Sequence, residues 1–526
     1  LGGHSLLAMQ LVARLREAGC HVEARTVFDH PVLCELAQRL RPLTQAADVT
    51  APQGLPLGAT RITPEQVPLA ELSQAELDAL LAHVPGGCAN VQDLYRLAPL
   101  QEGLLFHHRL NPAHDEYLVW SVRSFDSAAA RERYIAGLQA MVQRHDAWRT
   151  CFAWEGLPHP VQVVLRDAQL PVHPQVAEPG RDALNALKAA VAPSRAPMDV
   201  REAPLLRCHT LDDAVSQRWL LAIQMHHLTG DHVSLEVVEQ EIARLCEDPG
   251  AVLEPAPAYR PFVQRARAVD PLAQEAHFQE ALGEVTEGTM PFGVRNIGSD
   301  GVRGHRASVD AALGAKLRRA ARRHGVTAGV LWHTGWALLL ARAAQRHDPV
   351  FGTVLSGRLD GADQQARTVG LFINTLPLRV DLQQASAREA LQRTREALSA
   401  LLQHEQATLT LAQRCSGVPA SEPLFTAIFN YRHSSPAAVG GDHPQASLLG
   451  RLLDAEERVN YPIGVAIDDL GDGFEIEAQC AAGIAPEALA AQLLQTLQGL
   501  AEALLDAPDT PALAIEVLPP AQRHQQ

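Results

Sequence analysis

Strand-like and helix-like segments alternate along this chain from about residue 92 onward, and this alternation limits the folds that are open to it. Short apolar runs predict strands at residues 117–122, 219–225, 350–355 and 371–380. Apolar residues at helical spacing predict helices at residues 128–145, 233–246, 313–324 and 330–344. Alternation of this kind indicates helices packed on β-sheets, an α/β fold with a second half that begins near residue 267.

A small helical unit precedes this region. Leu7, Leu11 and Leu15 share one face of an amphipathic helix expected over residues 5–18, and a second helix is expected from Pro31 to Leu40. The two helices predict a compact helical unit.

The segment from 42 to 92 is rich in proline, which disfavours long regular elements. One short helix is expected within it, roughly from Ser73 to His83. The segment carries apolar anchors, namely Leu69, Leu72, Leu77 and Leu80. We therefore expect an interdomain linker that is packed against its neighbours.

Composition excludes several classes of protein. The formal net charge is −15 and no basic run is present, so a nucleic-acid partner is not expected. The 8 cysteines form no Cys-x-x-Cys pair, which argues against a zinc site or a disulfide framework. No apolar stretch reaches the roughly 20 residues of a membrane span, so no membrane association and a cytoplasmic location are expected. The chain starts at Leu1 without a signal segment, and we interpret it as a piece of a longer protein.

One serine stands directly before the first expected helix, in Gly2-Gly3-His4-Ser5. Serine is a preferred N-cap residue, so a structural role is the simplest interpretation. A hydroxyl at an exposed helix start is also accessible to a modifying enzyme, and a helix N-terminus favours an incoming phosphate. The pattern alone leaves both roles open.

The most informative segment spans residues 225–232 and reads Met-His-His-Leu-Thr-Gly-Asp-His. It lies between an apolar strand and an amphipathic helix, where a pocket can reach its side chains. If the strand continues through both histidines, their side chains point to opposite faces. One imidazole would then face a substrate and the other the interior. Adjacent residues on a strand do not easily bind one ion, so no metal is expected.

Residues Leu1–Leu6, together with Phe28–Pro31, resemble the second half of a peptidyl carrier domain of nonribosomal peptide synthetases. In that family the serine at the position of Ser5 carries a 4′-phosphopantetheine arm, whose thiol holds the growing peptide. The resemblance covers residues 1–41, lacks the first helix of the family, and favours modification of Ser5 over a cap alone.

The histidine-rich segment resembles the His-His-x-x-x-Asp-Gly signature of condensation domains and of the wider chloramphenicol acetyltransferase-like acyltransferases. By this resemblance His227 is the catalytic histidine, and His226 is a further catalytic candidate beside it. Asp231 is structural and ion-paired to an arginine, for which Arg358 is the candidate. His232 replaces the final glycine of the signature, which either alters the loop backbone or adds a second catalytic imidazole.

Further segments resemble other motifs of this family in their proper order. They are residues 97–103, 144–150, 369–375, 430–433 and 458–462. Asn374, Tyr431 and His433 lie in these motifs and are candidate residues of a substrate tunnel or of donor modification. Taken singly, each has a structural interpretation at least as good as a catalytic one.

The resemblance implies a fold and a domain order. The fold is a small all-α carrier fragment followed by an α/β condensation domain, whose two chloramphenicol acetyltransferase-like lobes form a V with a central tunnel. The expected domains are the carrier at 1–41, a linker at 42–92, an N-lobe at 93–266 and a C-lobe at 267–526.

The resemblance also implies a reaction. The peptidyl thioester on the Ser5 arm is transferred to the amine of an aminoacyl group on a downstream carrier, which forms a peptide bond. Positioning supplies much of such a rate enhancement, and an imidazole can orient or deprotonate the amine. Whether His227 is a base or only positions the amine stays open. The implied partners are an adenylation domain and an acceptor carrier domain in cis, a phosphopantetheinyl transferase, and peptidyl and aminoacyl thioesters.

A second histidine pair raises the question of donor modification. Dual epimerising and condensing members carry an additional His-His-(Ile/Leu)-x-x-x-x-Gly-Asp element. Residues 107–115 keep both histidines and the aspartate, but Arg109 and His114 stand at two other positions. His107 and His108 are therefore candidates for abstracting the α-proton, in epimerisation or Ser/Thr dehydration, or a helix-surface pair at the tunnel mouth. Plain condensation stays open, and donor modification is favoured over it.

Two rival classes remain. A non-catalytic recruiting domain would keep this fold without the active histidines, whereas His226, His227 and Asp231 are intact. A freestanding acyltransferase would use soluble coenzyme A, whereas a carrier precedes the condensation motifs here.

Overall fold

The structure is a computed structural model, and it does not describe every residue. It describes residues 15, 20–21, 33–42, 54–112, 115–176, 182–213, 216–248, 250–298, 301–358, 366–433, 446–456 and 459–519. Ser5 and nearly all of the helix expected over 5–18 lie outside the described residues. Of the second expected helix, the structure describes α3 (Leu33–Ala37), and the two-residue strands β1 (Cys20–His21) and β2 (Arg41–Pro42) pair nearby.

The described part of the expected linker, from residue 54 to 91, is packed, as expected. Its helix α4 (Gln74–Leu81) begins at Ser73, whose hydroxyl accepts a hydrogen bond from the Glu76 amide. Leu77 and Leu72 are buried in one apolar cluster with a three-stranded antiparallel sheet. The strands of that sheet are β3 (Val91–Arg96), β5 (Thr150–Ala153) and β6 (Val161–Leu165), in the order β3-β6-β5.

The N-lobe is built on a five-stranded sheet in the order β14-β4-β9-β8-β7. Its strands are β4 (Leu118–Phe125), β7 (Val172–Gln175), β8 (Leu206–Asp213), β9 (Arg218–His226) and β14 (Arg451–Glu456). Helices α6 (Ala128–Arg144) and α8 (His232–Glu247) pack on one face through a shared core that includes Leu138 and Ile242. Helix α7 (Ala183–Ala190) packs on the other face through Leu187. Every residue of β4 is buried or half-buried, because both faces of the sheet are covered.

The C-lobe is built on a six-stranded sheet in the order β10-β16-β15-β13-β11-β12. Its strands are β10 (Val302–Ser308), β11 (Val350–Leu355), β12 (Asn374–Arg379), β13 (Ala427–His433), β15 (Ile463–Asp469) and β16 (Phe474–Ala481). Its main helices are α11 (Ala311–Arg323), α12 (Ala328–Ala343), α14 (Ala387–Leu402) and α17 (Pro486–Asp506). Helix α12 is apolar all round and buried along most of its length, including Trp332 and Trp336.

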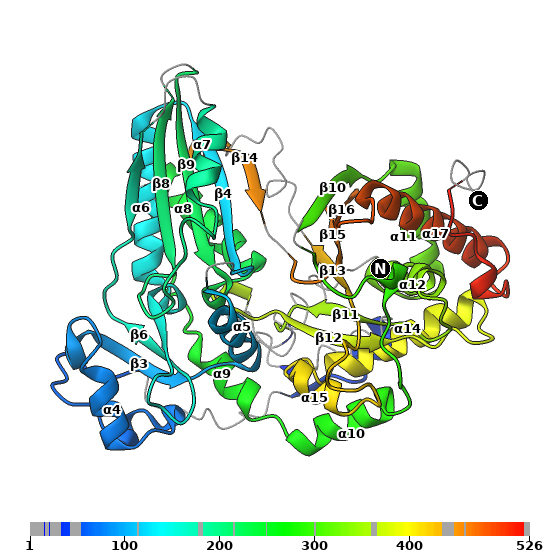
Figure 1. Cartoon of the computed structure of the whole chain (residues 1–526), viewed down its shortest axis with the longest axis horizontal. Coiled ribbons are helices and arrows are strands. Elements are labelled where there is room, and N and C mark those ends of the chain that lie inside the picture. The colour runs from blue at the N-terminus through cyan, green and yellow to red at the C-terminus, as the bar shows by residue number, and fades with distance from the viewer. Residues whose placement is uncertain are drawn as a thin grey trace.

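Helices α9 (Arg260–Arg267) and α10 (Pro271–Leu282) lie between the two lobes in the chain. Helix α15 (Leu409–Arg414) packs against α10 and β12. Figure 1 shows the lobes side by side and joined at one end, in the outline of a V. The expected α/β fold with two lobes is confirmed.

Strand β14 crosses between the lobes. It comes from the segment expected in the C-lobe, yet it pairs antiparallel with β4 in the N-lobe sheet. Among the residues that the structure describes, no helix combines the length and the apolar character that a membrane crossing requires.

Candidate active site

The two histidines of the signature lie at the end of the central N-lobe strand. Strand β9 ends at His226, and His227 begins a single 3-10 turn, η6 (His227–Thr229). The strand therefore does not continue through both residues. His226 is fully buried, whereas His227 is half-buried.

His226 is held by hydrogen bonds on both ring nitrogens. The backbone amide of Leu228 donates to its Nδ1 at 3.0 Å, so the ring proton lies on Nε2. Nε2 lies 2.9 Å from Oδ2 of Asp115 and donates to it. Burial lowers the pKa of His226, and the Asp115 carboxylate offsets this only in part. His226 is thus a neutral, fixed imidazole that cannot turn toward a substrate without losing both bonds.

The ring of His227 is oriented by its own turn. Nδ1 lies 3.1 Å from the Gly230 carbonyl oxygen, which only accepts, so Nδ1 carries the proton and Nε2 carries the lone pair. The His227 amide also donates to the Tyr117 carbonyl at 2.9 Å, which ties the turn to the residue just before β4. This tautomer is the one that can accept a proton through Nε2.

The ion pair expected between Asp231 and Arg358 is present. Nη2 of Arg358 lies 2.9 Å from Oδ1 of Asp231, and both side chains are buried. Asp231 is the N-cap of α8 and accepts from the Ser234 amide and hydroxyl. The Phe372 amide donates to its other oxygen at 3.1 Å. Asp231 belongs to the N-lobe and Arg358 follows β11 of the C-lobe, so this buried pair joins the lobes beside His227.

The residue before Arg358 must be glycine. Gly357 has φ of 66°, and a Cβ there would lie 1.8 Å from the Phe372 carbonyl oxygen. The Arg358 guanidinium stacks over the Phe372 ring at 3.8 Å. The glycine of this Ser-Gly-Arg sequence thus allows the Arg358 guanidinium to pack on Phe372 and to pair with Asp231.

His232, which replaces the glycine of the signature, is the first residue of α8. Its Nε2 lies 3.5 Å from Oε1 of Glu236, one turn further along, and its side chain is 33% exposed. This places it on the surface of the helix start, with a carboxylate partner of its own.

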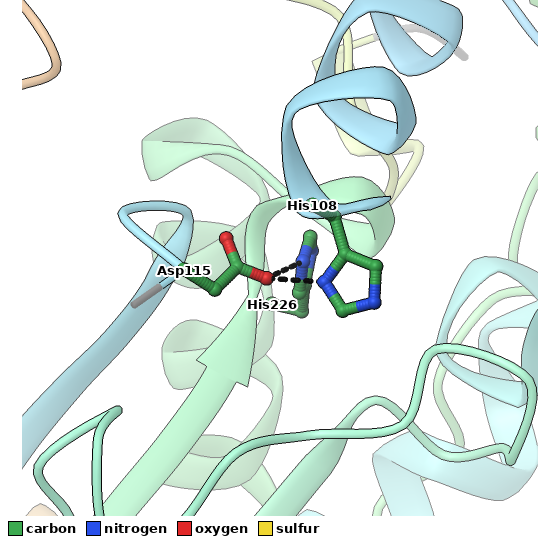
Figure 2. Close-up of side chains that lie close together, drawn as sticks. All are labelled: His108, Asp115 and His226. Carbon is green, nitrogen blue, oxygen red and sulfur yellow. Dashed lines mark hydrogen bonds and ion pairs between the residues drawn. The ribbon is translucent and has the colours of Figure 1, made fainter. Parts of the chain in front are cut away.

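The second histidine pair lies near the end of α5 (Pro99–Leu110), and its two members differ. His107 is exposed and tilts against the Tyr117 ring. His108 is buried, and its Nδ1 lies 2.6 Å from Oδ2 of Asp115, the same oxygen that binds His226. Figure 2 shows both rings meeting the same carboxylate oxygen of Asp115. The alternative of a helix-surface pair therefore does not hold for His108, which is buried.

Asp115 remains ionised in this cluster. Burial alone would raise the pKa of its carboxyl group, but hydrogen bonds from His108 and His226 hold that pKa well below its ordinary value. The Tyr117 amide donates to its second oxygen at 3.0 Å. The carboxylate therefore accepts from three donors.

The cluster has the residue types of a metal site, since the ligand atoms of His108, Asp115 and His226 lie within 4.8 Å of one another. The hydrogen-bond pattern opposes that use. Nε2 of His226 carries a proton, because Nδ1 accepts from the Leu228 amide, and a protonated nitrogen has no lone pair for a metal ion. The arrangement fits a hydrogen-bonded cluster.

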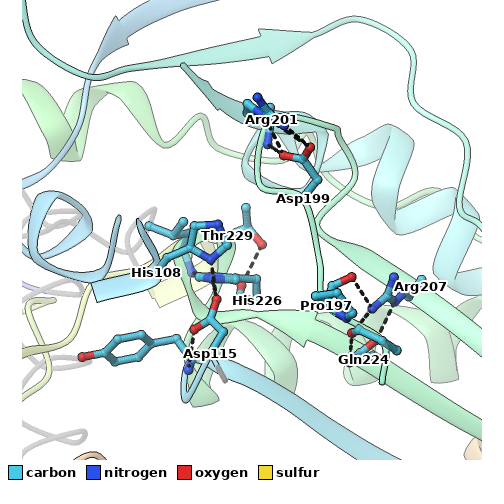
Figure 3. Close-up of polar contacts among 12 residues, drawn as sticks. His108, Asp115, Pro197, Asp199, Arg201, Arg207, Gln224, His226 and Thr229 are labelled. Atoms are coloured by element: carbon cyan, nitrogen blue, oxygen red, sulfur yellow. Dashed lines mark hydrogen bonds and ion pairs between the residues drawn. The ribbon is translucent and has the colours of Figure 1, made fainter. Parts of the chain in front are cut away.

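A cavity of about 460 Å³ opens beside His108. Trp154 and Met198 form its apolar wall, and Arg109 and the Asp199–Arg201 ion pair lie at its polar side. Figure 3 shows the Asp199–Arg201 ion pair and the His108–Asp115–His226 cluster in one view. The cavity is a pocket of mixed character next to a buried imidazole.

The remaining candidates lie in the C-lobe. Asn374 is buried and donates to the backbone carbonyls of Glu405 and Ala407, both at 2.7 Å. Tyr431 and His433 lie on β13 and share Asp469, whose Oδ2 is 2.6 Å from the Tyr431 hydroxyl. The described contacts do not bring any of these three to His227, so a role for them in the tunnel stays a prediction.

Several residues that position the site were not singled out from the sequence. Gln101 donates to the Leu228 carbonyl at 2.9 Å and so ties α5 to the signature turn. Asn460 donates to the Tyr117 hydroxyl at 2.6 Å across the lobes. Gln101 and Asn460 lie within quoted motifs, so their motif membership was the available signal. Asp115 was noted only as part of the additional element.

Two known protein families match the chain. A sequence model of the condensation domain matches residues 91–526. The chain belongs to the condensation-domain family. A second model, of the phosphopantetheine attachment site, matches residues 1–40. The expected carrier–condensation segment of a nonribosomal peptide synthetase is thereby confirmed.

The condensation domain and its carrier fragment have curated relatives. Malpinin synthetase and malpibaldin synthetase, both from Mortierella alpina, are 38% identical over 99% of this chain. A linear gramicidin synthase from Brevibacillus parabrevis is 28% identical over 88% of it. The chain spans only 7% to 10% of the length of these three relatives.

Solved structures share the fold of this condensation domain. The condensation domain of the Monacolin K polyketide synthase gives a TM-score of 0.64 at 19% identity, over 80% of this chain and 100% of that one. A four-domain nonribosomal peptide synthetase bound to AMP and glycine gives 0.67 at 16% identity, over 82% of this chain and 34% of that one.

Proposed function

We propose that this condensation domain forms a peptide bond at His227, between a donor peptidyl thioester and the amine of a downstream carrier-bound aminoacyl acceptor. The observation that carries the proposal is the His227 turn. Its ring is fixed with Nε2 basic, and the buried Asp231–Arg358 pair holds the turn where the two lobes meet.

The chemistry needs little activation of the thioester, and it needs a neutral amine held close to the carbonyl. Nε2 of His227 accepts a hydrogen bond from the attacking amine, and takes its proton as the tetrahedral intermediate forms. His226 does not contact the substrate in this proposal. It stabilises the His227 turn, because its Nδ1 accepts a hydrogen bond from the Leu228 amide. His232, one turn away at the start of α8, is assigned no step.

The donor reaches the site on a 4′-phosphopantetheine arm attached to Ser5. The match of residues 1–40 to the attachment-site model supports this, because Ser5 follows the paired glycines at the expected helix start. The arm supplies the thiol that holds the peptide. The proposed partners are a phosphopantetheinyl transferase, an adenylation domain and an acceptor carrier in cis, in a cytoplasmic synthetase, with substrates entering by a tunnel between the lobes.

Two variants test the proposal in a peptide-transfer assay followed by intact mass. His227→Ala removes the proton acceptor, and we expect transfer to fall by about 10²- to 10⁴-fold. Ser5→Ala removes the attachment point, and we expect no loaded chain and no transfer. His83→Gln, at an exposed site on the linker, is the control for loss of an imidazole. Transfer by His227→Ala at the control rate would instead support a non-catalytic recruiting domain, and transfer by Ser5→Ala from coenzyme A a freestanding acyltransferase.

We further propose that the donor residue is modified before transfer, by epimerisation or by Ser/Thr dehydration. The motif at residues 107–115 supports this, and so does the environment of His108, a buried imidazole beside a carboxylate and a pocket. The test uses a Thr-ending donor on Ser5 in deuterated buffer. Loss of one water indicates dehydration, and deuterium gain without water loss indicates epimerisation. A donor of unchanged mass would leave plain condensation.

A further inference from the structure

The His108–Asp115–His226 cluster borders a pocket through His108, and the proposed peptide-transfer step does not use that pocket. His226 is fixed between Asp115 and the Leu228 amide. His108 binds Asp115 through Nδ1, and Figure 2 shows its Nε2 on the far side of the ring. His108 lines the cavity of about 460 Å³. The cluster therefore presents one imidazole to a pocket, and His227 is not among the residues that line that pocket.

We propose that His108 is the base of a second reaction centre, which removes the α-proton of the carrier-bound donor residue in this pocket, separately from the bond-forming centre at His227. The inference rests on the proposed donor modification, and assigns it a site. His107, the other histidine of the pair, has no part in it, because it is exposed and packs against Tyr117.

The hydrogen bonds set the protonation state that such a base requires. Asp115 is ionised, so Nδ1 of His108 donates its proton to the carboxylate and Nε2 carries the lone pair. When Nε2 takes up a proton, the adjacent carboxylate stabilises the resulting imidazolium. His226 and the Tyr117 amide fix Asp115 from two other directions. Asp115 is thus a positioning residue, and His108 is the catalytic one.

The pocket offers groups for the rest of the reaction. Trp154 and Met198 can cover an apolar donor side chain. Removal of an α-proton turns the thioester carbonyl into an enolate, whose oxygen carries negative charge and needs a cation or a donor nearby. Arg109 lies 5.4 Å above the Trp154 ring, at the pocket wall. This guanidinium replaces the aliphatic residue of the related motif, and we assign it to the enolate oxygen.

The step balances without a metal or a redox partner. The Cα–H bond breaks, its electron pair enters the enolate, and the proton goes to Nε2 of His108. In epimerisation a solvent water protonates the opposite face of Cα, and the proton on Nε2 of His108 passes to the hydroxide left behind. In dehydration the electron pair forms the Cα–Cβ double bond, and the β-hydroxyl leaves as water with the proton from His108.

The test separates the two centres with crossed variants of the full chain, carrying a Thr-ending peptidyl pantetheine on Ser5 in deuterated buffer. For His108→Gln we expect deuterium incorporation or water loss at Cα to fall at least 100-fold, while transfer of a donor supplied already in its modified form continues. For His227→Ala we expect transfer to fall, while deuterium incorporation or water loss at Cα continues. Continued transfer by His108→Gln also shows that this variant is folded. His107→Gln is the matched control on the same helix.

Asp115→Asn tests the positioning role. Without the Asp115 charge the His108 imidazolium is less stable, so we expect slower deuterium exchange at Cα. The pH at which the exchange rate is half-maximal should shift to lower values. Among the described residues, the other charged or titratable groups near His108 are His226 from β9 and the pocket residues Arg109, Glu155, Asp199 and Arg201. A purely structural role would slow exchange without moving its pH profile.

The outcomes distinguish the two proposals. Deuterium exchange at the wild-type rate in His108→Gln would overturn the inference, and donor modification would then take place at another residue. Loss of exchange in His107→Gln alone would have the same meaning. A wild-type chain that neither takes up deuterium nor loses water would overturn donor modification and this inference together. Loss of both activities in His108→Gln, with the fold intact by circular dichroism, would show a single shared centre.

Discussion

Asp115 binds two histidines that come from different parts of the chain. His108 precedes it by 7 residues and His226 follows it by 111 residues. The motifs contain all three residues, but nothing in the sequence says that one carboxylate oxygen meets both rings. The fold decides this, because α5 and the end of β9 pack together. The Asp231–Arg358 pair was predictable, because the family resemblance names an arginine partner for that aspartate.

Replacing Asp115 with asparagine should destabilise the protein at pH 7. Two buried histidine donors then lose a charged acceptor, which costs roughly 1–3 kcal/mol. The pKa of Asp115 is depressed in the folded state, so its stabilisation is present above the ordinary value of 3.8 and is lost as the pH falls below it. The difference in unfolding free energy between the variant and wild type should therefore persist from pH 7 to about 4, and it should shrink at lower pH.

Urea unfolding at several pH values measures this difference. Asp126→Asn is the matched control, because Asp126 is an exposed aspartate in the same lobe. Equal unfolding free energies for the Asp115 and Asp126 variants at pH 7 would contradict the prediction.

Among the elements, β12 shows where sequence patterns are insufficient. The apolar run 371–380 predicts one strand, but the strand begins only at Asn374. Val369 and Phe372 are instead buried in the N-lobe core with Tyr259 and Phe262. An apolar run has the same appearance whether it pairs in a sheet or fills a neighbouring core. By contrast, β11 has the predicted bounds, since its whole run is a buried strand inside one sheet.

Arg358 packs on Phe372 in the segment that leads into β12, and Arg358→Met should lower the free energy of unfolding. The variant leaves Asp231 as a buried carboxylate without its cation, which costs roughly 3–5 kcal/mol. Urea unfolding followed by tryptophan fluorescence gives the value. The control Arg388→Met removes an exposed pair with Asp509, which should cost about 0–1 kcal/mol.

The second variant Asp231→Asn separates charge from packing. Combined with Arg358→Met it removes the isolated charge, so we expect the double variant to be more stable than Arg358→Met alone. If Arg358→Met unfolds at the same urea concentration as the Arg388 control, the ion pair does not hold the lobes together.

For the whole molecule, buried histidines make stability depend on pH. Burial lowers the pKa of His333 to about 4, and His209 and His277 shift in the same direction. The unfolded chain takes up protons near 6.5, before the folded chain does, so stability should fall as the pH drops from 6.5 to 4. His333 contributes up to roughly 3 kcal/mol of this fall.

His333→Gln should flatten that dependence. Glutamine takes up no proton, so the unfolding free energy of the variant should decrease less than that of wild type between pH 6.5 and 4.5. Parallel curves for variant and wild type would show that His333 takes no part. His83→Gln again controls for loss of an imidazole at the surface.

Strand β14 has a consequence for chimeric enzymes. A breakpoint near residue 266 separates the two lobes in sequence, but an exchanged second half also carries the outermost strand of the first half's sheet. The incoming strand must match β4 in length and in the irregular register between Leu452 and Asp454. A poor match would leave β4 with an unsatisfied backbone edge, which invites aggregation. Grafts that keep residues 446–456 with the recipient's first half avoid this mismatch.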